Sequence, residues 1–238
     1  MFPGYLANQF DYLKDKYNVI LINNPDYFRY NNTSSLILVL DYLKNTYICS
    51  SDNYFDKNPF KTYEYQSYYP VKINENTTNE YYVTFDETYL INDVSFNGGD
   101  YYMMGQVFFD KNTSTTFKEI LRKQYQRKDV KKMLWERLYM EFMDEIDLYA
   151  KIDRENIIHE FDSFDELRVF DKTYINYQNN QILNNIAIHF KAEVKDIWNI
   201  LDYQNKNEKL AFQFEVAKKT YLYTVDDLEN NKFTIKPL

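Results

Sequence analysis

Histidine and cysteine, the side chains that most often bind metals or move protons, are scarce in this sequence. Its 238 residues include two histidines, His159 and His189, and one cysteine, Cys49. His159-Glu160 begins like the metal-binding helix of a zinc protease, but Ser163 stands where that motif needs its second histidine. One cysteine excludes an internal disulfide. We therefore expect no zinc centre and no disulfide framework, and we predict no cofactor.

Three other residues have the types and order that metal-dependent hydrolysis requires. Asp171 is followed further along the chain by Glu193-Val194-Lys195. This order resembles the Asp…Glu-x-Lys arrangement of the PD-(D/E)XK nucleases, in which two carboxylates hold a divalent metal and the lysine polarises the nucleophile. The resemblance implies a metal-dependent nuclease, with Asp171, Glu193 and Lys195 as its site residues.

Glycine is also scarce, with four residues in the whole chain. The sequence contains no glycine loop of the kind that cradles phosphates and no nucleophile elbow. A chain so poor in glycine can hardly build a glycine-rich nucleotide site. We therefore disfavour nucleotide-dependent enzymes and predict that the protein is not an enzyme.

The charges between residues 118 and 147 are segregated by sign. Residues 118–132 carry seven basic and two acidic side chains, a net charge of +5, whereas residues 136–147 carry five acidic and one basic, a net charge of -4. This order opposes the macrodipole of a single helix. It suits head-to-tail contact between identical subunits or docking on a charged surface; the alternative is two solvated faces, which two separate helices can also supply. The predicted interaction residues are Arg122, Lys123, Arg127, Lys128, Lys131, Lys132, Glu141, Asp144 and Glu145.

Overall charge and hydropathy limit the partners. The net charge of -8 and the pI near 4.9 oppose nucleic acid as the main partner. The N-terminus lacks the basic and apolar segments of a secretion signal, so no export through a signal peptide is expected. The most apolar run, residues 36–40, is far shorter than the ~20 residues that cross a bilayer. We expect a soluble protein of a virion or a host cytoplasm, with no membrane partner.

Secondary structure in the first half follows from apolar periodicity and aromatic content. Residues 97–100, Asn-Gly-Gly-Asp, supply the positive φ angles of a tight turn, so we predict that the segments on either side form a hairpin. Aromatic and β-branched residues predict strands on both sides of this turn. The predicted elements are a helix at 5–16 and strands at 19–22, 63–73, 80–86, 88–96 and 101–109. The apolar segment 36–43 fits either a helix or a buried strand, and we favour a helix.

A long helix is predicted for residues 114–150. Val130, Leu134, Leu138, Phe142 and Ile146 recur every four residues and form one apolar stripe, with a break plausible near residues 127–129. Further along, the sequence predicts helices at 164–169 and 194–203 and strands at 173–177, 186–194, 210–216, 221–223 and 233–235.

These elements predict an α+β fold with an antiparallel aromatic-rich β region, one long helix that a break can divide, and a mixed α/β C-terminal part. Residues 1–238 are expected to form a single domain, or to divide into a mainly β part at 1–113 and a helix-containing part at 114–238.

The low glycine content and the charged helix favour a structural or interaction protein. We predict a bacteriophage virion component of the portal–tail junction, such as a collar, ring or head–tail connector. It would form a homo-oligomer and bind other virion proteins. The alternatives are the nuclease and a phage-encoded inhibitor of a host protein.

Overall fold

The structure, a computed structural model, describes residues 1, 7–75, 80–203, 211–227 and 232–238. It divides into two compact units, Met1–Glu160 and Phe161–Leu238, each with a hydrophobic core of its own.

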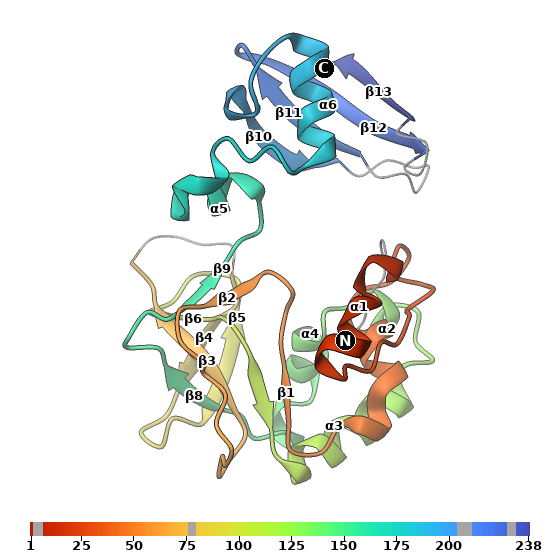
Figure 1. The fold of residues 1–238 in the computed structure, drawn as a ribbon. Helices are drawn as coiled ribbons and strands as arrows, with labels where there is room; N and C mark the ends of the chain where they lie inside the picture. The colour runs from red at the N-terminus through yellow and green to blue at the C-terminus, as the bar shows by residue number, and fades with distance from the viewer. Residues whose placement is uncertain (2–6, 76–79, 204–210, 228–231) are drawn as a thin grey trace. The chain divides into compact units, whose positions relative to one another are not determined.

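A seven-stranded sheet forms the centre of the first unit (Figure 1). The strand order is β1-β7-β3-β6-β4-β5, and β8 lies beside β3. Every pair is antiparallel except β3 and β8, which are parallel. The strands are β1 (Thr46–Ile48), β3 (Tyr68–Ile73), β4 (Tyr82–Phe85), β5 (Ile91–Ser95), β6 (Tyr101–Met103), β7 (Val107–Phe109) and β8 (Tyr149–Ile152). A separate antiparallel ribbon consists of β2 (Asn53–Phe55) and β9 (Ile158–Glu160).

Short helices gather at one side of this sheet (Figure 1). Phe117 and Leu121 of the longest helix, α3, are fully buried against the sheet with Phe109 of β7. The Asp110 side chain caps α3 by accepting a hydrogen bond from the Thr113 N–H at 2.8 Å. The helices are η1 (Ala7–Phe10), α1 (Tyr12–Tyr17), α2 (Thr33–Leu36), η2 (Ile37–Tyr42), α3 (Lys111–Gln124), η3 (Val130–Lys132), α4 (Trp135–Glu141) and η4 (Met143–Glu145).

The prediction of one long helix at 114–150 is wrong. α3 ends at Gln124, and the chain then forms the separate pieces η3, α4 and η4. Met133 and Leu134 have extended backbone with ψ near 149° and 145°, which interrupts any continuous helix. Val130, Leu138 and Ile146 are buried as the apolar stripe predicts. The four-residue period therefore identified core positions correctly, but these positions lie on or next to three short helical segments instead of one long helix.

The predicted hairpin across residues 97–100 is also wrong. Gly98 has φ +92°, as a turn requires, yet β4 lies between β5 and β6 in the sheet. The hairpin forms instead between β4 and β5. Its turn is fixed by the Asp86 carboxylate, which accepts hydrogen bonds from the backbone N–H groups of Thr88 and Leu90 at 2.8 and 3.1 Å.

The second unit is a four-stranded antiparallel sheet with a helix packed against it. The strand order is β10-β11-β12-β13. Leu183 and Ile186 of α6 are buried with Phe214 and Tyr223 of the sheet. The elements are α5 (Phe164–Phe170), η5 (Lys172–Tyr174), α6 (Gln181–Phe190), η6 (Val194–Asp196), β10 (Ile197–Asp202), β11 (Ala211–Val216), β12 (Lys219–Asp227) and β13 (Lys232–Pro237).

Several predicted elements have the wrong type. The strand predicted at 186–194 falls mostly on helix α6, because Asn180 caps that helix and Leu183, Ile186 and Ala187 bury one helical face. The helix predicted at 194–203 is mainly strand β10, and the strand at 173–177 is replaced by η5 and a turn. The strand predicted at 19–22 is irregular backbone.

Other predicted elements are confirmed. The segment at 36–43 is helical, and α5 covers the helix predicted at 164–169. The strands predicted at 210–216, 221–223 and 233–235 correspond to β11, β12 and β13. Residue 210, and residues 5 and 6 of the first predicted helix, lie outside the described residues.

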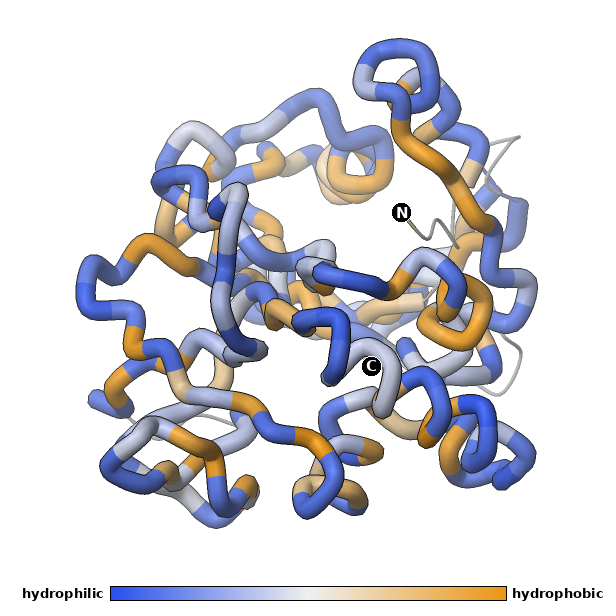
Figure 2. Tube along the Cα trace, turned by 90° about the horizontal axis from the view of Figure 1, so that it is seen from below, coloured by the Kyte–Doolittle hydropathy of each residue, from blue (hydrophilic) through white to orange (hydrophobic). Residues whose placement is uncertain are grey.

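Apolar stretches along the trace are short and alternate with hydrophilic ones (Figure 2). Among the helices that the structure describes, none combines the length and the apolar character that crossing a bilayer requires.

Candidate functional site

A buried carboxylate is the most unusual ionisable group of the first unit. Glu136, in the first turn of α4, is 8% exposed. Its Oε1 accepts a hydrogen bond from the Tyr69 hydroxyl at 3.4 Å, and its Oε2 has no hydrogen-bond partner among the described residues. Burial raises the pKa of Glu136 to about 7, although Asn32 and Tyr69 oppose this change. A buried acceptor that titrates near neutral pH is a candidate for binding a cation or a hydrogen-bond donor.

Aromatic rings lie beside this carboxylate. The ring of Tyr69 stacks on Trp135, with centroids 5.8 Å apart and planes at 13°. Trp135 also packs edge-on against Phe109 and Phe117. The backbone N–H of Trp135 donates a hydrogen bond to Asn32 Oδ1 at 2.7 Å, which holds the start of α4 in place. Aromatic rings next to a carboxylate suit an alkylammonium group.

A cation lies at the edge of the same region. The exposed Arg137 follows Glu136 on α4, and its guanidinium carbon is 5.5 Å from the centroid of the Phe96 ring. Phe96 packs against Tyr81, with centroids 4.1 Å apart. Burial raises the pKa of Tyr81, Arg137 opposes this change and Glu136 adds to it, so both charged groups are close to this hydroxyl. The region therefore offers groups for both ends of a zwitterion.

A pair of carboxylates lies at one end of the β2–β9 ribbon. Asp52 immediately precedes β2, and the strand register pairs Asn53 with Glu160, the last residue of β9. As a result, carboxylate oxygens of Asp52 and Glu160 lie within 4.8 Å of each other. Burial is the main cause that raises the pKa of Tyr69, and Glu136 and Glu160 both add to it. Glu160 of this pair and the buried Glu136 thus both influence the same hydroxyl.

The donor set of this pair fits a hard divalent cation. Carboxylate oxygens are the ligands that Mg²⁺ prefers, and Mg²⁺ commonly binds through one or two carboxylates while it keeps several waters. Asp52 and Glu160 are therefore the residues of the first unit that could hold such an ion.

The basic residues of the predicted interaction surface are partly paired within the chain. Arg127 binds Asp129 at 2.6 Å and Glu141 at 2.7 Å, and Arg122 binds Asp41 at 2.9 Å. Lys131 lies over the rings of two tyrosines. The other predicted residues, Lys123, Lys128, Lys132, Asp144 and Glu145, are exposed on α3, η3, η4 and their connections.

These contacts remove part of the reasoning behind the predicted surface. The two charged halves belong to separate short helices, so no single macrodipole opposes them. The Arg127–Glu141 contact also joins the halves inside one chain. Assembly of identical subunits through these nine residues stays a prediction.

The residues of the predicted nuclease site are engaged in local contacts. Asp171 accepts hydrogen bonds from the N–H and hydroxyl groups of Thr173 at 2.9 and 2.7 Å. Lys195 pairs with Glu193 at 2.8 Å. His159, the first residue of the incomplete zinc-protease motif, lies on strand β9, with its Nε2 3.0 Å from Asp56 Oδ2.

Comparison with known proteins identifies relatives of this chain. No protein-family model matches it. The choline-phosphate cytidylyltransferase of Streptococcus pneumoniae is 32% identical over 170 residues, 71% of this chain and 74% of that protein. The 2-aminoethylphosphonate cytidylyltransferase of Lancefieldella rimae is 28% identical over 177 residues, 72% of each. The solved structure of a CTP:phosphocholine cytidylyltransferase from Streptococcus pneumoniae matches with a TM-score of 0.69 at 32% identity, covering 72% of this chain and 76% of that one.

The fold is that of a nucleotidyltransferase. The chain belongs to the cytidylyltransferase family, because a 32% identical relative is covered over 74% of its length.

This membership corrects the functional predictions made from sequence. The chain belongs to a family of enzymes, so the prediction of a non-enzymatic virion component of the portal–tail junction is wrong, together with its virion location. The nuclease and host-inhibitor alternatives fall with it. The error came from treating a glycine-rich loop as a requirement for nucleotide chemistry.

Sequence reasoning also missed Glu136, Tyr69, Asp52 and Glu160. One signal was present for Glu136: it directly follows Trp135, and Leu138 and Tyr139 lie two and three positions further along α4, so a helix places this carboxylate beside apolar side chains. No local pattern marks Asp52 and Glu160, which are 108 positions apart and meet only through strand pairing.

Proposed function

We propose that this chain transfers a cytidylyl group from CTP to a small phosphate or phosphonate that carries an amine cation, with choline phosphate as the first candidate. The observation that carries the proposal is the buried Glu136 beside the Tyr69–Trp135 stack. A carboxylate and aromatic faces favour a quaternary or primary ammonium group. The printed names of the relatives, which include choline phosphate and 2-aminoethylphosphonate as acceptors, support the same class of substrate.

The proposed reaction is a displacement at phosphorus. An oxygen of the acceptor phosphate attacks the α-phosphorus of CTP, the bond from that phosphorus to the bridging oxygen breaks, and pyrophosphate leaves. Mg²⁺, when bound, would neutralise the developing charge on the phosphate oxygens. Asp52 and Glu160 would hold that ion, and Glu136 would hold the cationic end of the acceptor.

Orientation is the main contribution that these residues can make. Glu136 and Glu160 both act on the Tyr69 hydroxyl, so the ammonium site and the metal site are neighbours within the first unit. An acceptor anchored at its ammonium end would direct its phosphate toward the carboxylate pair. Such positioning converts a bimolecular encounter into a reaction between held groups.

Binding of choline phosphate, measured by isothermal titration calorimetry, tests this proposal. Affinity should rise as the pH increases through about 7, because Glu136 must ionise to attract the cation. Glu136→Gln should weaken binding about tenfold or more and remove this pH dependence. Glu119→Gln makes the same replacement at an exposed carboxylate on α3 and is the matched control.

Two outcomes would reject the proposal. One is wild-type affinity and pH dependence in Glu136→Gln. The other is equal binding of phosphocholine and of a phosphate ester of the same size without the ammonium group. Release of pyrophosphate from CTP, with 2-aminoethylphosphonate as a second acceptor, then measures the transfer itself.

A further inference from the structure

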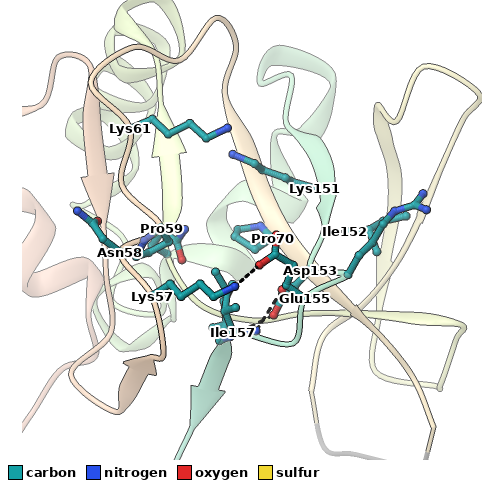
Figure 3. Close-up of a pocket in the computed structure, with 13 residues that line it drawn as sticks. Lys57, Asn58, Pro59, Lys61, Pro70, Lys151, Ile152, Asp153, Glu155 and Ile157 are labelled. Atoms are coloured by element: carbon teal, nitrogen blue, oxygen red, sulfur yellow. Dashed lines mark hydrogen bonds and ion pairs between the residues drawn. The ribbon is translucent and has the colours of Figure 1, made fainter.

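A hollow in the first unit is lined by residues that do not belong to the candidate site (Figure 3). It has a volume of about 380 Å³ and lies between the loop that follows β2 and the connection from β8 to β9. The ribbon pairs Asn53 with Glu160 at one end and Phe55 with Ile158 at the other. Ile158 lines the hollow, so the hollow lies past the ribbon end that is opposite to the Asp52–Glu160 pair. A small ligand in this pocket is therefore separate from the reacting groups.

A buried amide without a partner lines this pocket. Gln106 is 2% exposed, and its Oε1 accepts no hydrogen bond from any residue that the structure describes. The preceding Gly105 has φ +93°, and a Cβ atom there would lie 2.8 Å from Ile158 Cγ2. The backbone therefore turns tightly against Ile158 and holds Gln106 in the wall. A buried carbonyl oxygen without a donor costs free energy, which a ligand N–H or O–H group in the pocket would recover.

The acidic groups of the pocket are already occupied. The Asp153 carboxylate accepts hydrogen bonds from the N–H groups of Ile157 and Ile158 at 3.3 and 3.1 Å, which shape the turn between β8 and β9. Glu155 pairs with Lys57 at 2.7 Å. These carboxylates are therefore poor partners for a ligand cation.

More basic than acidic side chains line the pocket. Lys61 and Arg154 have no ion-pair partner within the described ranges, and Lys151 shares Glu64 with two tyrosine hydroxyls. Lys151 Nζ also lies 3.7 Å from the centroid of the Tyr68 ring, which fixes its direction. Figure 3 shows Lys61 and Lys151 extending toward each other from opposite walls. In a chain of net charge -8, this convergence of ammonium groups favours an anion.

We propose that this pocket binds a small anion that also carries a hydrogen-bond donor, such as a phosphate monoester with a free hydroxyl group. Lys61 and Lys151 contact the anionic group, and Gln106 Oε1 accepts a hydrogen bond from the hydroxyl. This assignment is independent of the function proposed for Glu136, since it uses none of the same residues.

Calorimetric titration with two probes tests the assignment. Glycerol 3-phosphate has both the anion and the hydroxyl groups, whereas methyl phosphate has only the anion. The wild-type chain should bind glycerol 3-phosphate about tenfold more tightly than methyl phosphate. Gln106→Met should abolish this preference, and Lys61→Gln should weaken binding of both probes about tenfold. Lys123→Gln, an exposed substitution on α3 outside the pocket, should bind both probes like the wild type.

Several results would overturn the assignment. They are no saturable binding of glycerol 3-phosphate, unchanged binding in Lys61→Gln, or binding that Glu136→Gln abolishes while Lys61→Gln retains it. Lys61 is exposed, so its substitution should leave the unfolding midpoint unchanged. If Gln106→Met lowers the unfolding midpoint, its binding data are set aside, and the binding of the two probes by Lys61→Gln decides whether the assignment holds.

Discussion

Replacing Glu136 by Gln should change how the stability of the first unit depends on pH. Folding raises the pKa of this carboxyl from 4.5 to about 7, because burial disfavours its charged form. Below pH 4.5 the carboxyl group is protonated in both the folded and the unfolded chain, so folding buries no charge. As the pH rises from 4.5 through about 7, the unfolded chain loses the proton first, so the free energy of unfolding falls.

The size of this effect follows from the two pKa values. A difference between 4.5 and about 7, at 1.36 kcal/mol per pH unit, corresponds to about 3 kcal/mol. Gln has nearly the same shape but cannot ionise. The wild type should therefore lose about 3 kcal/mol of stability relative to Glu136→Gln between pH 4.5 and pH 8.

Urea denaturation followed by tryptophan fluorescence measures this difference. The chain has two tryptophans, so a Trp198→Phe background leaves Trp135, the neighbour of Glu136, as the reporter. Glu119→Gln in the same background controls for loss of an exposed carboxylate. A difference between wild type and Glu136→Gln that stays constant over this pH range would refute the reasoning.

Two other substitutions test the geometry of the first unit. Gly105→Ala should destabilise the fold by about 2–3 kcal/mol, because it adds a clash with Ile158 to an unfavourable φ of +93°. Gly98→Ala has nearly the same φ but open space around its Cβ, so it should cost only about 1 kcal/mol; equal midpoints in thermal unfolding would contradict the clash. Asp52→Asn should raise the Mg²⁺ concentration for half-maximal pyrophosphate release about 10- to 100-fold. Asp56→Asn, at the other end of β2, should leave it near the wild-type value, and an unchanged Mg²⁺ dependence in Asp52→Asn would remove the metal assignment.

Local sequence patterns predicted the type of those elements in which the spacing of apolar residues matches the face that the structure buries. The alternation in 210–216 predicted β11, and a helix was the favoured interpretation of the apolar run at 36–43, although that run also fits a buried strand. The pattern at 186–194 misled, since alternating apolar residues also fit a helix that buries Leu183, Ile186 and Ala187. Glycine positions predicted the turn at 97–100 but not which strand pairs with which.

The sequence alone determined that helices are mixed with antiparallel aromatic-rich strands, and it determined many core positions, because these depend on neighbours a few residues apart. The tertiary structure decided the site. Asp52 and Glu160 meet through the pairing of β2 with β9, and Glu136 acquires its raised pKa only where α4 packs against Tyr69. Burial and long-range strand pairing create these properties, and neither leaves a mark in the order of nearby residues.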